Sequence, residues 1–309
     1  MRFTLKQLSY FVAAGEAGSV IKASENIHVS QPSISSAISR LEDTYGIQLF
    51  IRHHAQGISL TSAGRELLRE AKSLLNHGAQ LQSFAGELSN KVMGTIEVGC
   101  FNPLAPIITP ALCHDFMAIH PDTDIRVREA HQGDLIQLLR QGSIDIALTY
   151  DLQLHNDIDF IQLAVLPPYA LMAADHPLCA QSPIELKQLI NEPMILLDLP
   201  LSSEYFMALF SARKLKPTIK VRTRLTDVQR GLVACGHGYS LANVRPQNKY
   251  ALDGNPLKYV ALQGSHLPLN LGIAILSSNR PTPVQNAFIA HCSSAVTDRD
   301  IPGMTMEFD

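Results

Sequence analysis

The sequence predicts a chain of two fold classes, α+β at its N-terminal end and α/β in the larger remainder. Residues 1–60 combine helical periodicity with a short hairpin pattern, and together these predict a winged helix-turn-helix. Residues 61–90 carry apolar side chains at alternating spacings of four and three, which predicts one long linker helix. Strand and helix patterns alternate through residues 91–309, a rhythm typical of an α/β domain with a helix-covered sheet.

Three helix patterns fill the first 45 residues. Leu5, Leu8 and Phe11 share one face of the first helix, and Ser19 is placed to cap a second, shorter one. Ser30 stands before the third helix as a candidate cap. These short helices with tight turns between them predict a small helical head.

The third helix has clear start and stop signals. Pro32 lies in its first turn, where a missing backbone N–H has no cost. Ile34 and Leu41 belong to its apolar stripe, and Gly46 ends it. Residues 47–52 and 58–60 then predict the two strands of a hairpin, after which Thr61 is placed to cap the linker helix.

Two helices joined by a turn of three to four residues can lay the second helix in the major groove of DNA. The turn here is 28–30, so the start of the third helix would face base edges and the hairpin would reach the flanking backbone. Short hydroxyl and amide side chains followed by cations suit that contact. The candidate DNA-binding residues are Ser30, Gln31, Pro32, Ser33, Ser35, Ser36, Arg40, Arg52 and His53. An ordinary three-helix bundle is the alternative interpretation.

The linker helix carries an apolar seam that recurs for about three heptads. Its candidate dimerisation residues are Leu67, Ala71, Leu74, Leu81 and Leu88. The 3.5-residue period favours a partner helix from a second copy of the chain, and Gly78 weakens the seam. The alternative is a helix that lies on the core of its own domain.

The C-terminal part predicts two similar α/β halves. The first half alternates strands and helices at 95–100, 106–119, 124–129, 134–140 and 145–149. The second half repeats the order at 194–197, 204–213, 218–223, 226–235 and 239–244. The extended segment 160–173 lies between the halves, and 269–276 follows the second, so two strands crossing near Pro167 and Leu267 would join two lobes around a cleft.

Residues 1–65 resemble the LysR-type transcriptional regulators. The matching elements fall in order, among them GS at 18–19, VSQPS at 29–33, LF.R at 49–52 and LT.AG at 60–64. The remainder resembles the family's effector domain, which is similar to periplasmic binding proteins, through IDIAL at 144–148 and GHGYSLAN at 236–243. Ser24 and the pair His53-His54 depart from the usual pattern, where alanine and more arginine are common.

This resemblance implies three domains, a DNA-binding domain at 1–60, a dimerisation helix at 61–90 and an effector-binding domain at 91–309. Within the last, lobe I would span about 91–165 and 267–309, and lobe II about 166–266.

Ligands of open α/β sheets bind beyond the carboxyl ends of the strands. The loops at those ends, which line the effector pocket in LysR-type proteins, give a candidate effector-binding set. It consists of Cys100, Phe101, Asn102, His131, Thr149, Leu201, Ser202, Ser203 and Asn243. Helix starts at Asn102-Pro103 and Ser202-Ser203 would aim backbone N–H groups at the cleft and favour a small anion such as an organic acid. Alternatively, these polar residues only cap helices.

Composition and missing motifs narrow the function. The net charge of −3 does not by itself indicate nucleic acid binding. The five cysteines lack paired spacing and the twelve histidines lack ligand spacing, so we expect reduced thiols, no metal and no cofactor. A redox role for Cys100 or Cys235 stays open as an alternative. Catalytic signatures such as HExxH and GxSxG are absent, which speaks against an enzyme.

The sequence therefore predicts a cytoplasmic, effector-responsive regulator without a secretion signal or membrane span. Its expected partners are double-stranded DNA, a small-molecule effector and further copies of the chain as a homodimer or homotetramer, with RNA polymerase left open. The competing hypothesis is a solute-binding or enzymatic α/β protein with an accessory helical domain.

Overall fold

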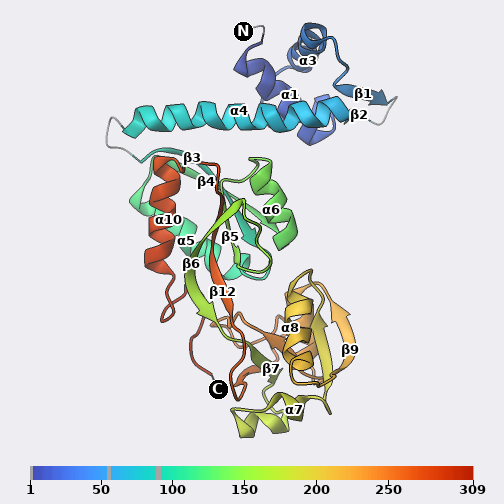
Figure 1. Cartoon of the computed structure of the whole chain (residues 1–309), viewed down its shortest axis with the longest axis vertical. Coiled ribbons are helices and arrows are strands. Elements are labelled where there is room, and N and C mark those ends of the chain that lie inside the picture. Colours follow the sequence, from blue (N-terminus) through green and yellow to red (C-terminus); the bar gives the residue numbers. More distant parts are fainter. Residues whose placement is uncertain (1–2, 54–56, 88–91, 309) are drawn as a thin grey trace. The chain divides into compact units, whose positions relative to one another are not determined.

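The computed structural model describes residues 3–53, 57–87 and 92–308, with the backbone alone at 79–80 and 82–87. It consists of two compact units (Figure 1). One comprises Met1–Lys91 with Arg140–Ser143, and the other comprises Val92–Leu139 with Ile144–Asp309.

The N-terminal unit contains the predicted helices and hairpin. Its elements are α1 (Leu5–Ala17), α2 (Val20–Asn26), α3 (Gln31–Tyr45), β1 (Phe50–His53), β2 (Gly57–Leu60) and α4 (Ser62–Glu87). The Ser19 side chain accepts from the Lys22 backbone N–H at the start of α2, and Gly46 ends α3 in the left-handed conformation. The first strand was predicted too early, because β1 begins at Phe50 rather than Ile47.

Helix α4 packs on the core of its own unit. Ala71 is buried in one apolar cluster with Phe11, Ile34 and Leu41, and Leu67 packs against the same cluster. Thr61 holds the start of the helix, since its hydroxyl accepts from the Gly64 N–H at 2.9 Å and donates to the Gln48 carbonyl at 2.8 Å. The alternative interpretation of the seam therefore holds for the first turns of α4.

The second unit has two lobes, and lobe I is built on one five-stranded sheet. Its strand order is β4-β3-β5-β12-β6. The strands are β3 (Gly94–Phe101), β4 (Thr123–Ala130), β5 (Ile146–Tyr150), β6 (Ile158–Leu166) and β12 (Leu269–Leu276), and the helices are α5 (Ala105–Ile119), α6 (Gln132–Arg140) and α10 (Pro283–Ala295). The pairs β3–β4 and β3–β5 are parallel, as predicted, while β12 runs antiparallel to β5 and β6.

Lobe II contains two smaller sheets, ordered β10-β7-β11 and β8-β9. Its elements are β7 (Tyr169–Ala173), a 3₁₀ turn (Pro177–Gln181), α7 (Leu186–Leu189), β8 (Pro193–Leu197), α8 (Ser202–Ser211), β9 (Thr218–Thr223), α9 (Thr226–Ala234), β10 (Ser240–Ala242) and β11 (Leu257–Ala261). The alternating strands and helices from β8 to β10 match the predicted order, whereas β11 was not predicted.

The chain passes between the lobes twice. The first passage is the Pro167–Pro168 break between β6 and β7, because neither proline can donate to a strand ladder. The second is residues 262–268, between β11 and β12. Figure 1 shows β6 and β12 extending from the sheet of lobe I toward β7. Both passages lie where the sequence placed the crossing strands.

Candidate functional site

The start of α3 presents one polar, exposed face. Ile34, Ile38 and Leu41 point into the core, and some of the residues between them are exposed on the other side of the helix. Gln31 and Arg40 are among the exposed residues of that face. The candidate DNA-binding residues that are exposed on and before α3 are Ser30, Gln31, Pro32, Ser33, Ser36 and Arg40.

Ser30 occupies the N-cap position without capping. Its side chain makes no hydrogen bond to the helix N-terminus, and its hydroxyl lies 2.8 Å from the Ser33 hydroxyl instead. Both hydroxyls are exposed and can rotate, so they remain able to donate to or accept from a ligand. The structure corrects the expected cap while leaving both residues at the helix start.

A shallow groove of about 470 Å³ runs beside this face, lined by α1 as well as α3. Ser33, Ser36 and Arg40 line it from α3, and Lys6 and Tyr10 line it from α1. The Lys6 ammonium lies 5.8 Å from the centroid of the Tyr10 ring. Lys6 was not among the predicted DNA-binding residues. A lysine on the first helix, close to the helix-turn-helix in sequence, could have indicated it.

The hairpin forms a second hollow, of about 260 Å³, with the opposite side of α3. Ser35, Arg52 and His53 line it together. The His53 Nε2 lies 2.8 Å from the Ser59 hydroxyl across the two strands, which fixes the imidazole on the hairpin. His54 lies outside the described residues.

The seam residues of α4 fall into two groups. Ala71 lies inside the core of its own unit and Leu67 is half-buried there, so a partner helix cannot reach Ala71. Leu74 is 37% exposed and Leu81 is 70% exposed. Leu88 lies outside the described residues. Of the predicted dimerisation residues that the structure describes, Leu74 and Leu81 are the ones exposed enough to contact a second subunit.

Between the lobes of the second unit lies a small cavity of about 50 Å³, here called the interlobe cavity. Its wall is mostly apolar and includes four aromatic side chains, those of Phe101, Tyr150, Tyr169 and Phe206. A larger opening of about 720 Å³, the interlobe groove, shares with it the lining residues Pro103, Ile107, Thr226, Arg230 and Pro246. The two spaces therefore adjoin.

The structure sorts the nine effector-site candidates. Phe101, Ser202 and Asn243 line the interlobe cavity, and Asn102 and His131 line the groove. The Asn102 amide lies 3.5 Å from the His131 Nδ1. The other four line neither space: Cys100, Thr149, Leu201 and Ser203.

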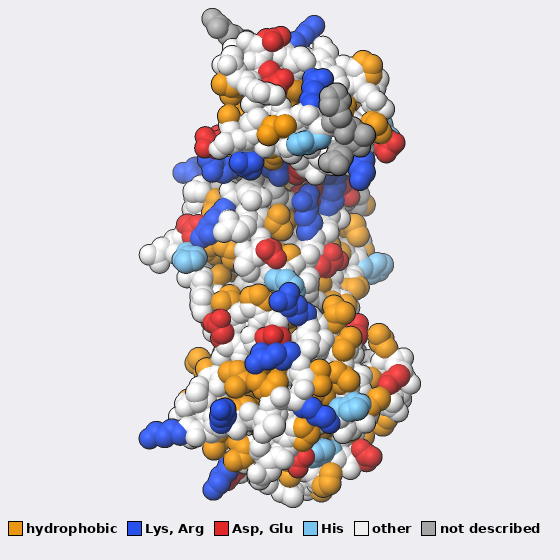
Figure 2. Space-filling model, turned by 90° about the vertical axis from the view of Figure 1, so that its right-hand side faces the viewer, with side chains coloured by type: hydrophobic (Ala, Val, Ile, Leu, Met, Phe, Trp, Pro, Cys, Tyr) orange, Lys and Arg blue, Asp and Glu red, His pale blue; other side chains and the backbone are white. Residues whose placement is uncertain are grey.

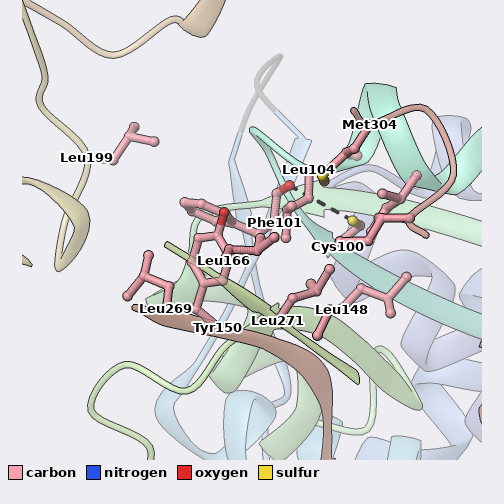
Figure 3. Packing of buried hydrophobic residues seen from close by; sticks show 14 of the residues in the cluster. Cys100, Phe101, Leu104, Leu148, Tyr150, Leu166, Leu199, Leu269, Leu271 and Met304 are labelled. Atoms are coloured by element: carbon pink, nitrogen blue, oxygen red, sulfur yellow. Dashed lines mark hydrogen bonds between the residues drawn. The ribbon is translucent and has the colours of Figure 1, made fainter. Parts of the chain in front are cut away.

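Cys100 and Thr149 point into the core rather than the cleft. Both are fully buried on adjacent strands, and Cys100 belongs to the main apolar cluster of the second unit, which includes residues of both lobes (Figure 3). Within the described part of the chain, the Thr149 hydroxyl has no hydrogen-bond partner. Because side chains alternate along a strand, the residue next to a cleft-facing one points the opposite way.

The expected anion hole made of two helix starts is not present. Helix α5 begins at Ala105, after an extra turn that contains Pro103, so Asn102 lies outside the helix and donates its backbone N–H to the Ala130 carbonyl. At α8, the N–H groups of Ser202 and Ser203 already donate to the carbonyls of residues 200 and 199. Backbone donors that already have partners do not attract an anion.

Arg230 places a cation at the interlobe cavity and groove that was not predicted from the sequence. It lies on α9, is only 7% exposed, and lines both the cavity and the groove. Its Nη2 donates to the carbonyls of Asn248 (2.7 Å) and Tyr250 (3.0 Å). No carboxylate in the described residues pairs with it. The sequence does contain a sign of this buried cation, because Arg230 falls on the same face of α9 as the buried residues Gln229 and Val233.

Asn243 holds an unpaired acceptor beside the cavity. Its amide nitrogen donates to the Leu166 carbonyl (2.8 Å) and to the Tyr205 hydroxyl (3.2 Å), so its orientation is fixed. Its Oδ1 is buried and has no hydrogen-bond partner among the described residues. Burial raises the pKa of Tyr205 to about 12, and its hydroxyl donates to the Leu267 carbonyl. A bound molecule with an O–H or N–H group would satisfy the Asn243 acceptor.

The two candidate redox cysteines lack the features of reactive thiols. Burial raises the pKa of Cys100 far above its ordinary value. The Asp253 carboxylate accepts from the Cys235 thiol at 3.5 Å and raises the pKa of that exposed residue as well. Since the thiolate is the reactive form, a raised pKa disfavours both as sensors.

None of the helices in the described ranges is both long and apolar enough to cross a bilayer. Figure 2 shows one face of the molecule, on which apolar side chains reach the surface beside basic and histidine side chains. Exposed apolar side chains at the interlobe groove are Leu225, Tyr250 and Leu252.

Comparison with known proteins gives matches over nearly the whole chain. Residues 5–65 match the model of the bacterial regulatory helix-turn-helix protein, lysR family, and residues 89–297 match the LysR substrate binding domain.

Individual relatives agree with these matches. The HTH-type transcriptional regulator YybE of Bacillus subtilis (strain 168) is 25% identical over 284 residues, covering 92% of this chain and 96% of that protein. The regulator CfxR of Cupriavidus necator is 26% identical over 290 residues, covering 93% and 90%. The crystal structure of HinK, a LysR family transcriptional regulator from Pseudomonas aeruginosa, is 34% identical with a TM-score of 0.66, covering 96% and 99%.

Proposed function

The chain belongs to the LysR family of DNA-binding transcription regulators with a substrate-binding domain, and from this premise we propose which of its residues read DNA, join subunits and bind the effector. The relatives described above are transcriptional regulators, which favours this function over the solute-binding or enzymatic alternative. A regulator of bacterial DNA works beside the chromosome, so we place the protein in the cytoplasm. Contact with RNA polymerase remains a proposal without a residue assigned to it.

For DNA, we propose that α3 enters the major groove. The observation that carries this is the exposed face of Gln31, Ser33, Ser36 and Arg40, opposite the buried stripe of the same helix. Gln31 can make a bidentate contact to adenine, while Arg40 and Lys6 can reach phosphates. On the other side of α3, Arg52 and His53 of the hairpin would contact the adjoining backbone.

Gln31→Ala is expected to lower affinity for a specific DNA site by about 1–3 kcal/mol and to leave binding to random duplex almost unchanged. The side chain is exposed, so the fold should not change. The measurement is fluorescence anisotropy with a duplex selected from genomic fragments and with a random duplex of equal length. Arg52→Ala is the control for a phosphate contact, with about equal losses on both duplexes. Equal losses for Gln31→Ala would refute base reading by that residue.

For assembly, we propose a homodimer or homotetramer joined through the exposed part of α4. Leu67, Ala71 and Leu75 of α4 pack inward, whereas Leu74 and Leu81 are large apolar side chains at the surface of the same helix. Seven residues separate them, which is the repeat of a coiled-coil seam.

Leu81→Asp is expected to raise the dissociation constant of the oligomer by at least about 100-fold, because an unpaired charge buried in an interface costs about 3 kcal/mol or more. Leu81 is 70% exposed, so the isolated subunit should keep its fold. Ser73→Asp, an exposed position on the same helix, adds the same charge outside the seam and should change nothing. Sedimentation velocity over a range of concentrations separates the two. An unchanged oligomer for Leu81→Asp would exclude this seam.

For sensing, we propose that a small organic anion binds in the interlobe groove and reaches the interlobe cavity. The observation that carries this is Arg230, a buried cation in the wall of both spaces with no carboxylate partner in the described residues. The charge of the arginine takes the place of the helix N-terminal donors that the sequence predicted. Ser202, Asn243, Asn102 and His131 would supply the polar contacts. Thermal-shift screening of small organic acids tests the proposal.

A further inference from the structure

The chain turns back on itself after α10. The match to the LysR substrate binding domain ends at residue 297, so residues 298–308, here called the C-terminal strap, lie beyond it. The strap is firmly packed. The Asp298 carboxylate accepts from the Val165 N–H at 2.7 Å, at the end of β6, and Ile301 and Met304 are buried in the core. Figure 3 shows Met304 with Leu104 and Cys100 in the main apolar cluster of the second unit.

The strap also holds lobe II. Its backbone exchanges two hydrogen bonds with the segment that follows β10, since Gln247 donates to the Gly303 carbonyl and Thr305 donates to the Arg245 carbonyl, both at 2.9 Å. Met304 forms an antiparallel bridge with Pro246. At Gly303 the strap touches lobe I as well, because an added Cβ there would collide with the Ile107 carbonyl of α5.

The end of the strap packs against the base of lobe II. The Phe308 ring lies 4.1 Å from the Arg245 guanidinium carbon, and its centroid lies 6.3 Å from that of Tyr169 on β7. The marked C-terminus beside β7 in Figure 1 agrees with these contacts. The strap therefore touches both lobes along its length and adds a tie between them to the passages at 167–168 and 262–268 and to direct contacts such as that of Gln153 with Glu204.

The strap adjoins the proposed effector site. Ile107 and Pro246, which the strap contacts, each line both the interlobe cavity and the interlobe groove. We propose that the C-terminal strap is a brace that holds the lobes together and keeps the interlobe cavity small until the brace shifts. The interlobe cavity, at about 50 Å³, has room for a few water molecules. A ligand larger than this can enter the cavity only if the lobes move apart. This inference rests on the proposed effector site for its role in sensing.

Gly303→Ala tests the brace in the full-length protein. Both Gly303 and Gly254 have left-handed backbones, with φ of +74° and +84°. An alanine at either position carries the same backbone strain, but only at 303 does its Cβ meet the Ile107 carbonyl, and nothing lies within 4 Å at 254. Gly254→Ala is therefore a matched control.

The readout is hydrogen–deuterium exchange of backbone amides, measured by mass spectrometry with no ligand added. For Gly303→Ala we expect at least about tenfold faster exchange in the strap and in 245–247, and also at the start of α8 across the cavity. The last region makes no contact that the substitution removes, so its response reports lobe opening. Gly254→Ala should leave all three regions at the wild-type rate.

Phe308→Ala provides a milder second variant should Gly303→Ala fail to fold, because the half-exposed Phe308 ring contributes packing rather than backbone geometry. It should change the same three regions in the same direction. Faster exchange confined to the strap and 245–247 in both variants would overturn the brace. Since no effector is used, this result is independent of whether an anion binds at Arg230.

Discussion

Gly64→Ala is expected to destabilise the N-terminal unit by about 2–4 kcal/mol, because the added methyl group has no space and displaces the start of α4. A Cβ at Gly64 would collide with the Leu49 carbonyl oxygen and lie 3.1 Å from the Leu60 Cδ2. The backbone oxygen cannot move aside as a flexible side chain would. The start of the helix must shift, and DNA binding through the adjoining hairpin should be lost with it.

The shift would also break the hydrogen bonds that seat α4. Thr61 donates to Leu49 through its backbone N–H (3.0 Å) and to the Gln48 carbonyl through its hydroxyl (2.8 Å). That hydroxyl in turn accepts from the Gly64 N–H. Each bond contributes on the order of 1 kcal/mol, and buried carbonyls left without donors cost more.

Gly78→Ala is the matched control on the same helix. Its added Cβ would lie 3.8 Å from the Leu5 Cδ1, which is ordinary van der Waals contact. Alanine is the better helix former by about 1 kcal/mol, so this variant should be more stable than wild type. Urea unfolding of the full chain, followed by circular dichroism, should move the transition of the N-terminal unit to lower urea for Gly64→Ala and to higher urea for Gly78→Ala. Equal midpoints for the two variants would contradict the packing argument.

Helix starts and stops were predictable because their signals are local. Ser19, Gly46 and Thr61 each act on atoms within a few residues, so the sequence contains the whole interaction apart from the Thr61 bonds to 48–49. Ser30 shows the limit of such reasoning. A serine in the N-cap position can form a hydrogen bond to the helix backbone or to a neighbouring side chain. Here the Ser30 hydroxyl is hydrogen-bonded to the Ser33 hydroxyl.

The partner of a buried face could not be predicted from its period. The seam of α4 has the spacing of a coiled coil, yet Ala71 is buried in the apolar cluster of its own unit, whereas Leu81 is exposed. Both arrangements remove the same stripe from water, so periodicity alone does not distinguish them. The distinction depends on where the N-terminal head ends along α4, which is a property of the tertiary fold.

The cleft was predicted in part for a similar reason. Phe101, Ser202 and Asn243 follow strands or begin a helix at the strand ends, and topology brings them to one cavity. Arg230 was not predicted as an effector-binding residue because it lies in the middle of a helix rather than in a loop at a strand end. Asn102 was misplaced as a helix start because α5 begins later than the Asn-Pro pair suggests. The strap was missed because its contacts join residues far apart in the sequence.

Ser202→Leu is expected to abolish the effector response while DNA binding and oligomerisation remain. Ser202 is only 4% exposed and lines the interlobe cavity, whose volume is about 50 Å³. A leucine side chain there would fill this space and remove the hydroxyl. Ser203→Leu is the control, since Ser203 is half-buried on the same turn of α8 and does not line the cavity.

The measurement begins with the organic acid that most raises the unfolding temperature of the wild-type protein. A ligand present at 100 times its dissociation constant stabilises the folded state by about 2.7 kcal/mol, which a thermal-shift experiment detects. Ser202→Leu should lose that stabilisation and show no heat of binding in titration calorimetry, whereas Ser203→Leu should keep both. Because the hydroxyl and the space beside Arg230 are removed together, wild-type affinity in Ser202→Leu would mean that the effector does not use the interlobe cavity.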